Sequence, residues 1–553
     1  MSKSRAREST NAIGRLYVTM RHLMNRGFYK PMGVSGKTLR DALLELRPEI
    51  YGVIAEDKLE MNGLFYVLDR LPEGIEQCSY INLTSDEGYD KSTLVAIIPP
   101  KRRRKCYRID ADQMNVQITR GRSDIYDILT HLTFLFIESH KIANRVLIED
   151  DSNTIRDWGK LEEAINKKKL SKKEKEVVLV YTANIVGRTF EEVERVYQRC
   201  ATQNNPHRFL KLVYWLGKLA IEEIQEKSKR TITFSKILQE RLGQHLYGDK
   251  WASEIKEILI DKGLIDKPVH IISANMHSVM NYLYSKQALE THTHLTAMEL
   301  FETLSDNKSA EYHDKIKKYA NKKGLIYVKD NSGTNINVQI IDTSKVDFSK
   351  AHLINKAKSK PVLIVMDYAF GEQAYETMDE LLKTYHSKKG KKYDLQVASV
   401  SIMGKAGILD GGKGDIMVPT AHVFEGTADN YPFENSLNAN QFSDQGMVVA
   451  VGPMITVLGT SLQNKEVLRY FKDSTWGMIG LEMEGAHYQK AIQSASKIRK
   501  SIREDVKVRY AYYASDNPLE TGSTLASGGL GLNGVKPTYL ITQKILEDIL
   551  EVE

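Results

Sequence analysis

Two short acidic segments near the C-terminal end carry the strongest sign of chemistry in this chain. Residues 481–486 (Leu-Glu-Met-Glu-Gly-Ala) and residues 513–518 (Tyr-Ala-Ser-Asp-Asn-Pro) each place a carboxylate where an apolar, strand-like stretch stops. In open α/β sheets ligands bind at strand ends, so we expect these carboxylates to share a site. Cleavage of a purine–ribose bond needs two such groups, because one must hold the ribose hydroxyls and the other must protonate the departing base.

Asp516 is the candidate for the proton donor. It follows a mostly apolar run, residues 511–515, so its carboxyl should be partly desolvated. Desolvation raises the pKa of a carboxyl group toward the range that a general acid needs near neutral pH. The alternative is a structural one, because Ser-Asp-Asn-Pro is also strong turn chemistry and Asp516 could cap that turn.

Glu482 and Glu484 lie on either side of Met483. On an extended segment the two carboxylates share one face, whereas they diverge if the chain enters a helix there. A carboxylate here could accept hydrogen bonds from ribose hydroxyls, and Met483 could form an apolar floor under the sugar. The alternative is a helix N-terminus, which favours acidic residues.

Residues 403–407 (Met-Gly-Lys-Ala-Gly) follow a predicted strand at residues 397–402. We predict a turn in which Gly404 and Ala406 let the backbone approach a bound group closely, while Lys405 could add a positive charge for an anion. A tight turn without any ligand competes with this interpretation. Residues 414–418 (Gly-Asp-Ile-Met-Val) are predicted to turn into another strand.

The elements that must position these residues change character along the chain. Residues 10–75, 124–146 and about 150–262 have helical periodicity, and residues 79–120 contain short strand patterns. From about residue 263 strands alternate with helices, which predicts an α/β fold with a mostly parallel sheet. The predicted strands there are residues 269–273, 362–366, 397–402, 447–451, 478–481 and 506–513. We therefore predict an N-terminal α+β domain (1–150), a helical, lysine-rich region (151–262) and an α/β domain (263–553).

Composition indicates an ordinary folded protein of more than one domain. The chain has 553 residues, 42% of them hydrophobic and 27% charged. Its three cysteines, Cys78, Cys106 and Cys200, have neither a metal-ligand spacing nor a disulfide framework, which suits a reducing cytosol. We see no secretory signal and no apolar run of membrane-spanning length, and we expect a cytoplasmic protein that does not contact the membrane.

The formal net charge of +7 comes largely from local basic clusters. Such runs could grip phosphates, but solvated loops and helix faces explain them more simply. No aromatic residues alternate with these lysines as a platform for single-stranded nucleic acid requires, so nucleic-acid binding is weakly supported. The clusters are residues 101–105, 167–175 and 388–392.

Taken in order, residues 404–407, 414–418, 482–486 and 515–516 resemble the motifs of the nucleoside phosphorylase and nucleosidase superfamily. The segment 516–519, with Gly522 nearby, is most similar to AMP nucleosidases, although this glycine is one residue further on. The resemblance covers roughly residues 263–553. It implies a three-layer α/β domain with a mostly parallel central sheet.

The resemblance also implies roles for individual residues. Asp516 would protonate the base and Glu484 would bind ribose. Residues implied to contact the substrate are Met483, Glu482, Gly404, Lys405, Ala406, Gly371 in a second strand-to-helix turn, Met454 and Ile455 against the base, and Ser515. No cofactor and no metal are implied, and self-association into a homo-oligomer is.

Departures from the superfamily pattern leave the nucleophile open. Phosphorylases have an arginine and a hydroxyl residue where this chain has Ile402 and Lys405, and the residues after 269–273 lack the glutamate of methylthioadenosine-type nucleosidases. His277 is the remaining candidate for the base that activates water. The sequence therefore predicts hydrolysis of the N-glycosidic bond of a purine nucleotide or nucleoside. The alternatives are a phosphate-dependent phosphorylase and a catalytically inactive nucleotide sensor.

Overall fold

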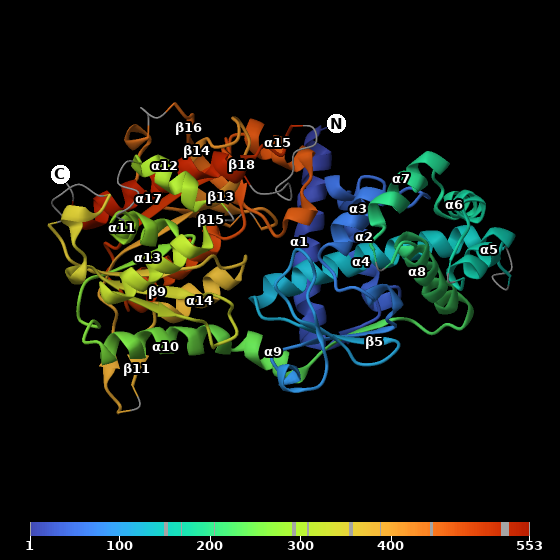
Figure 1. Cartoon of the computed structure of the whole chain (residues 1–553), viewed down its shortest axis with the longest axis horizontal. Coiled ribbons are helices and arrows are strands. Elements are labelled where there is room, and N and C mark those ends of the chain that lie inside the picture. The colour runs from blue at the N-terminus through green and yellow to red at the C-terminus, as the bar shows by residue number, and fades with distance from the viewer. Residues whose placement is uncertain are drawn as a thin grey trace.

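The computed structural model shows two halves that lie side by side (Figure 1). It describes residues 2–148, 153–167, 169–203, 205–289, 295–306, 309–352, 358–387, 389–427, 429–442, 446–520 and 530–551. Helix α1 (Ser2–Arg26) runs along the boundary and contacts both α2 (Lys37–Leu46) of the N-terminal half and α15 (Lys465–Asp473) of the C-terminal half.

The N-terminal half combines a mixed sheet with helices that pack on it. The sheet has the strand order β1-β6-β2-β5-β4-β3. The long helix α4 of this half packs against α8. The strands are β1 (Phe28–Tyr29), β2 (Tyr80–Thr84), β3 (Ala96–Ile97), β4 (Cys106–Arg108), β5 (Gln113–Gln117) and β6 (Thr231–Phe234). The remaining helices are α3 (Met61–Leu68), α4 (Gly121–Val146), α5 (Arg156–Ile165), α6 (Lys172–Val186), α7 (Phe190–Cys200), α8 (Arg208–Gln225) and α9 (Lys236–Gly243).

The C-terminal half is a three-layer α/β structure, which confirms the predicted fold class. Its ten-stranded sheet follows the path β15-β14-β16-β17-β13-β7-β10-β9-β8, and β18 pairs with β13 and β14. The strands are β7 (Val269–Ser273), β8 (Leu325–Val328), β9 (Val338–Asp342), β10 (Val362–Met366), β13 (Val397–Ile408), β14 (Ile416–Phe424), β15 (Asn430–Pro432), β16 (Val449–Thr456), β17 (Gly480–Glu482) and β18 (Lys507–Asp516). A separate two-stranded sheet joins β11 (Tyr385–His386) to β12 (Lys392–Tyr393).

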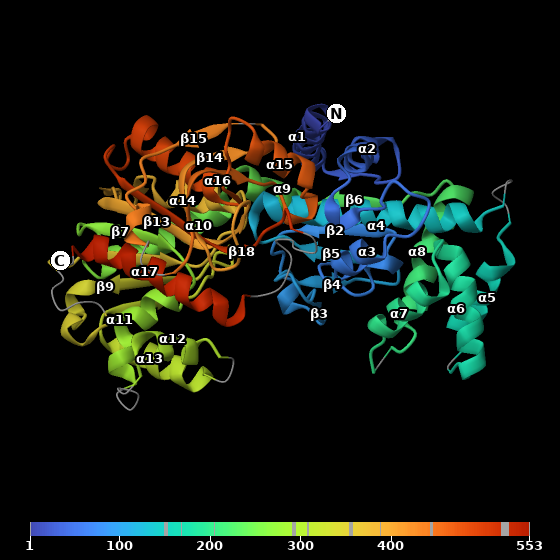
Figure 2. The same ribbon diagram turned by 90° about the horizontal axis from the view of Figure 1, so that it is seen from above.

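Helices cover both faces of this sheet (Figure 2). One apolar core lies between the sheet and α10, α14 and α16, and another lies between the sheet and α11, α13 and α17. These helices, with α12, are α10 (Leu246–Asp261), α11 (Ser278–Ala288), α12 (Ala297–Leu304), α13 (Ala310–Lys322), α14 (Gln373–Leu381), α16 (Gly485–Gln493) and α17 (Val535–Leu550). Strands buried on both faces read as continuous apolar runs, which is why Val362–Met366 was recognisable in the sequence.

At its centre the sheet keeps the predicted parallel arrangement. Strands β18, β13, β7 and β10 run parallel, and β9 and β8 follow antiparallel at one margin. At the other margin five strands close a ring, because β13 pairs with β18, β18 with β14, β14 with β16, β16 with β17 and β17 with β13. A closed ring leaves these strands no free edge along their paired lengths.

The glycine-rich segment at residues 403–407 is not a turn, contrary to the sequence prediction. Strand β13 continues through it to Ile408, because β18 pairs with it in register as far as Ala514 opposite Ala406 and, after a shift in register, with Asp516 opposite Gly407. Ser515 and Asp516 likewise belong to β18, where the sequence had suggested a turn. Pairing between distant strands thus overrides the local preference of small residues for turns.

Near residue 250 the chain passes from one apolar core to the next. The core of the N-terminal half takes residues from Ala12 to Tyr247, with Leu462 added from the C-terminal half, and the next core begins at Trp251. Strand β6 pairs with β1 and β2, so the segment around residue 232 joins the N-terminal sheet. The domain boundaries at residues 150 and 262 stay a prediction.

Among the helices that the structure describes, none is both long enough and apolar enough to span a bilayer.

Candidate functional site

The candidate site opens where β13 changes its neighbour. On one side β7 pairs with β13 as far as Ser273 opposite Ile402, and β17 takes over with Leu481 opposite Gly407. Between these points no described strand pairs with β13 on that side. A cavity of about 250 Å³ lies there, with Gly404 and Lys405 of β13 on its wall. The small residues of this segment therefore lie along an open strand edge.

Side chains from several strand ends complete the wall of this cavity. Glu482, Met483 and Glu484 come from the junction between β17 and α16, and Tyr368 follows β10. Tyrosine rings make much of the wall apolar with polar tips. The other lining residues are Ser273, Ala369, Ile402, Met403, Thr460, Tyr488, Tyr512 and Tyr513.

Glu484 is held in place by the backbone of the neighbouring turn. The Gly371 amide donates a hydrogen bond of 2.9 Å to Glu484 Oε1. Burial, together with the charge of Glu482, raises the pKa of Glu484 to about 7. A carboxyl group with this pKa lies near the balance between its two protonation states at neutral pH.

Glu482 has a different environment although it is only two residues away. Thr456 Oγ1 donates to Glu482 Oε1 at 2.5 Å, and His422 Nδ1 lies 3.2 Å from the same oxygen. The backbone amides of Glu484 and Gly485 donate to Oε2. Burial opposes ionisation, but the nearby His422 ring and the hydrogen bond from Thr456 hold the pKa of Glu482 below its ordinary value. Glu482 thus caps the start of α16, and both its oxygens have protein partners.

Asp516 ends β18 on the other side of β13. The residue is only 1% exposed, and Ser515 Oγ donates to Asp516 Oδ1 at 2.6 Å. Asp516 Oδ2 has no hydrogen-bond partner among the described residues. Burial raises the pKa of Asp516, while Ser515, Lys405 and a second lysine lower it in part.

The two acidic segments are therefore close together, but their carboxyl groups do not line the same cavity. Leu481 and Asp516 lie opposite Gly407 on its two sides, so their backbones are about 10 Å apart at the usual strand spacing. Glu484 lines the 250 Å³ cavity and Asp516 does not. Gly522, which carried part of the sequence resemblance, lies outside the described residues.

His277 lines a second and larger cavity of about 620 Å³. Lys405 and Tyr513 line both this cavity and the smaller one, so the two adjoin. The rings of His277 and His313 lie 4.8 Å apart. Burial and the neighbouring His313 lower the pKa of His277, which leaves its imidazole neutral near pH 7.

Six of the predicted site residues line neither cavity: Met454, Ile455, Ala406, Gly371, Ser515 and Asp516. Met454 and Ile455 are fully buried in separate apolar cores, because β16 is enclosed between β14 and β17. Ala406 is buried in β13, and Ser515 Oγ donates to its carbonyl at 3.1 Å. Gly371 acts through its hydrogen bond to Glu484.

The sequence prediction missed residues that the structure brings to the site. Tyr368 lies two residues beyond β10, and the rule that ligands bind at strand ends could have found it. Arg120 of the N-terminal half carried no such signal. Its guanidinium carbon lies 4.6 Å from the centre of the Phe370 ring, just before the turn that holds Glu484.

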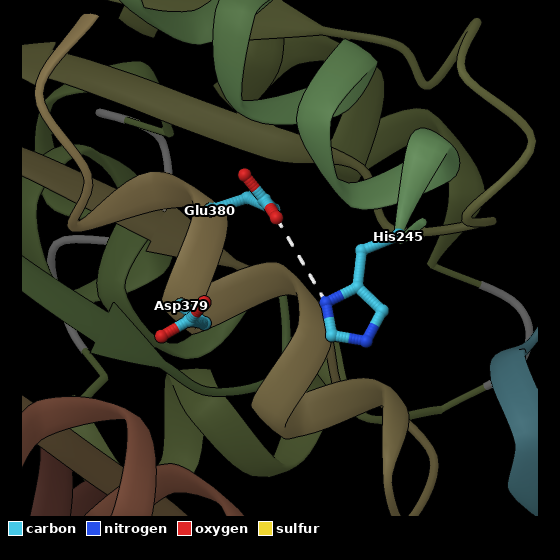
Figure 3. Close-up of side chains that lie close together, drawn as sticks. All are labelled: His245, Asp379 and Glu380. Atoms are coloured by element: carbon cyan, nitrogen blue, oxygen red, sulfur yellow. Dashed lines mark ion pairs between the residues drawn. The ribbon is translucent and has the colours of Figure 1, made fainter. Parts of the chain in front are cut away.

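One group of potential metal ligands lies outside this site (Figure 3). Ligand atoms of His245, Asp379 and Glu380 come within 4.8 Å of one another, with His245 Nδ1 3.8 Å from Glu380 Oε1. Lys383 lies 2.6 Å from Glu380 and 3.3 Å from Asp379, and Arg499 lies 2.8 Å from Asp379. Because these two cations already neutralise the carboxylates, the cluster is an ion-pair network.

The family described as "Family of unknown function (DUF6909)" matches residues 37–305 and 284–551 of the chain. No curated protein has significant sequence similarity to this chain.

Solved structures with some similarity include three nucleoside-processing enzymes. A futalosine hydrolase mutant of Helicobacter pylori strain 26695 is 14% identical, over 52% of this chain and 100% of that chain, with a TM-score of 0.31. The methylthioadenosine/S-adenosyl homocysteine nucleosidase of Campylobacter jejuni is 11% identical, over 52% and 97%, with a TM-score of 0.29. Isoform 2 of uridine phosphorylase from Schistosoma mansoni is 12% identical, over 53% and 90%, with a TM-score of 0.32. Similarities this low do not assign an activity.

Proposed function

We propose that this chain, which belongs to the family of unknown function DUF6909, hydrolyses the N-glycosidic bond of a purine nucleotide or nucleoside. The observation that carries the proposal is the cavity at the open edge of β13, with the Glu484 carboxylate on its wall and the Asp516 carboxyl at the adjoining strand end. The tyrosines around it offer flat apolar surfaces for a sugar and a base.

In the proposed reaction Glu484 accepts hydrogen bonds from the ribose hydroxyls. Its negative charge stabilises the positive charge that develops at the anomeric carbon as the bond to the base lengthens. The Gly371 amide keeps the carboxylate oriented. Met483 provides the apolar contact beneath the sugar.

Asp516 gives its proton to a ring nitrogen of the base as the carbon–nitrogen bond breaks. The bonding electron pair leaves with the base, so the base departs neutral. Water adds to the anomeric carbon and loses a proton. His277, neutral near pH 7 and on the wall of the adjoining cavity, is the proposed acceptor of that proton.

The direct test is to incubate the protein with AMP, adenosine, inosine and methylthioadenosine and to measure free base by chromatography. We expect base release that falls about 10²- to 10⁴-fold in Asp516→Asn, the usual range for loss of a general acid. Asp410→Asn is the matched control, because the Asp410 side chain is 89% exposed and, among the residues that the structure describes, forms an ion pair only with Lys472 at 3.6 Å. Base release that is unchanged in Asp516→Asn would refute the assignment.

A phosphate-dependent phosphorylase is the second candidate. Lys405 lines both cavities and, among the described residues, makes no ion pair, so it could hold an inorganic phosphate. Base release that requires added phosphate would identify this reaction. Release at full rate in phosphate-free buffer would identify the hydrolase.

A further inference from the structure

Another cavity, of about 320 Å³, lies between the two halves of the protein. The N-terminal half contributes side chains of α1 and α4 to its wall. The C-terminal half contributes side chains from α14, from α16 and from the chain around the ends of β14 and β16. This interfacial cavity shares no lining residue with the two cavities at β13, and its volume suits a small molecule.

A buried carboxyl group without a full set of partners points to a ligand in the interfacial cavity. Glu425 lines the cavity and is 2% exposed, and its Oε1 has no hydrogen-bond partner among the described residues. Burial raises the pKa of this carboxyl to about 8, so it is mostly protonated and uncharged near pH 7. A buried polar atom without a partner is unfavourable, and a ligand that exchanges a hydrogen bond with Glu425 removes this cost.

Two cations of the same wall form no ion pair within the described part of the chain. Arg21 Nη1 donates to Tyr17 Oη at 2.9 Å, and its guanidinium carbon lies 5.4 Å from the centre of that ring. Lys490 Nζ lies 5.2 Å from the centre of the Tyr375 ring. Ring faces attract these cations but do not neutralise them, so both can bind an anion.

The charges of the wall favour an anion that carries a single charge. Arg21, Arg122 and Lys490 are positive, whereas Glu372 and Asp429 are negative, so one positive charge is in excess. Arg122 and Glu372 lie 2.9 Å apart and pair with each other. Burial lowers the pKa of both histidines of the wall, which leaves them neutral near pH 7. A carboxylate matches this balance better than a phosphate monoester, which carries about two negative charges.

We infer that the interfacial cavity binds a small aromatic carboxylate. The carboxylate accepts hydrogen bonds from Arg21 and lies near the charge of Lys490. A polar group on the ring exchanges a hydrogen bond with Glu425, and the ring packs against three aromatic side chains of the wall, Tyr17, Tyr375 and Phe424. This site is separate from the cavity that holds Glu484, and it does not depend on the proposed reaction.

Titration calorimetry with 4-hydroxybenzoate and its uncharged isostere 4-hydroxybenzamide tests the charge of the ligand. We expect wild type to bind the acid, and to bind the amide about tenfold to a hundredfold more weakly, the range for a hydrogen bond to a charged group. In Arg21→Ala the affinity for the acid should fall by a similar factor, while the affinity for the amide stays the same. Lys490→Ala, at an exposed position where folding is little affected, should also weaken binding of the acid.

Arg26→Ala is the matched control, because Arg26 is an exposed arginine of the same helix that does not line the cavity. Lys405→Ala tests whether the acid binds at β13 instead, since Lys405 lines both cavities there. The inference would be overturned by a failure of wild type to bind the acid or by equal affinities for acid and amide. A preference for the acid that Arg21→Ala leaves unchanged, or that Lys405→Ala abolishes, would overturn it too.

Benzoate, which lacks the hydroxyl group, tests the hydrogen bond to Glu425. We expect wild type to bind benzoate about threefold to tenfold more weakly than 4-hydroxybenzoate, and Glu425→Leu to bind the two acids equally. Thermal unfolding of Glu425→Leu checks that the variant is folded. A preference for 4-hydroxybenzoate that persists in the folded variant would refute the contact with Glu425.

Discussion

Two glutamates separated by one methionine have opposite electrostatic environments in this protein. Glu482 receives hydrogen bonds from Thr456 and from two backbone amides and lies 3.2 Å from His422 Nδ1, and these contacts hold its pKa below the ordinary value. Glu484 has one backbone donor and a charged neighbour, so its pKa rises to about 7. Pairs of carboxyl groups whose pKa values are pushed apart are typical of sites that do acid–base chemistry.

This difference predicts a pH dependence for the proposed reaction. Glu484 must be ionised to bind ribose and to stabilise positive charge, so its ionisation should make kcat/KM for the nucleoside rise with pH through about 7, against the decline that loss of the Asp516 proton causes. In Glu484→Gln we expect a lower rate and no such rise, measured as kcat/KM between pH 5.5 and 8.5.

The exposed Glu434 offers the control, since Glu434→Gln should keep the wild-type profile. An ascending limb that persists in Glu484→Gln would assign the ionisation to another group.

At the scale of elements, two strand-to-helix junctions build the site. The junction between β17 and α16 carries Glu484, and the junction between β10 and α14 carries Gly371, whose amide orients it. Gly371 has φ +54°, a conformation that other residues adopt only with strain, and Ser123 leaves no room for a Cβ atom. Glycine is therefore required at position 371 for two reasons: the backbone has a positive φ, and the contact between the two halves leaves no room for a side chain.

We predict that Gly371→Ala lowers both the free energy of unfolding and the activity. Strain at positive φ costs about 1–2 kcal/mol and overpacking adds about 1–3 kcal/mol. Urea denaturation measures the loss in the free energy of unfolding, and the rate of base release measures the loss of activity that displacement of Glu484 causes.

Gly390→Ala separates strain from crowding. Gly390 has φ +75°, but a Cβ atom there would meet nothing within 4 Å, so only the strain should appear. Equal losses of stability in the two variants would show that the contact with Ser123 contributes nothing.

At the scale of the whole molecule, the two halves enclose several ionisable groups that are neutral when folded. Burial raises the pKa of Glu376 and of Glu425 to about 8. Both residues belong to the C-terminal half beside its boundary with the N-terminal half: Glu425 shares a cavity with Ile13 and Tyr17 of α1, and Glu376 lies against Gly121 of α4. Docking of the halves thus keeps these carboxyls protonated.

This predicts that stability falls as the pH rises from 6.5 to 8. The folded protein keeps two protons that the unfolded chain, with ordinary glutamate pKa values, has already lost, so the free energy of unfolding decreases with pH. The decrease is about 3 kcal/mol at most for two such groups. Burial lowers the pKa of His270 and His352 to about 4, and these histidines oppose the trend only below about pH 6.5.

Thermal unfolding at pH 6.5 and pH 8 tests this prediction. In Glu425→Gln we expect the difference in melting temperature between the two pH values to be roughly half that of the wild type. Glu434→Gln, at an exposed position, should leave it unchanged. A melting temperature that is equal or higher at pH 8 would contradict the prediction.

The sequence by itself determined the elements whose signal is local. Apolar runs such as Val269–Ser273 and Val362–Met366 predicted buried strands, and the acidic segment 482–484 was correctly placed where a strand passes into a helix. These signals depend only on neighbouring residues, because burial on both faces and helix starts leave their pattern in the chain itself.

Only the tertiary structure decided which segments meet. Residues 403–407 became a strand because β18 pairs with them, Met454 was buried because β14 and β17 enclose its strand, and Arg120 reached the turn beside Glu484 because α4 packs there. Each of these outcomes depends on contacts between residues far apart in the chain, which no local pattern of side chains encodes.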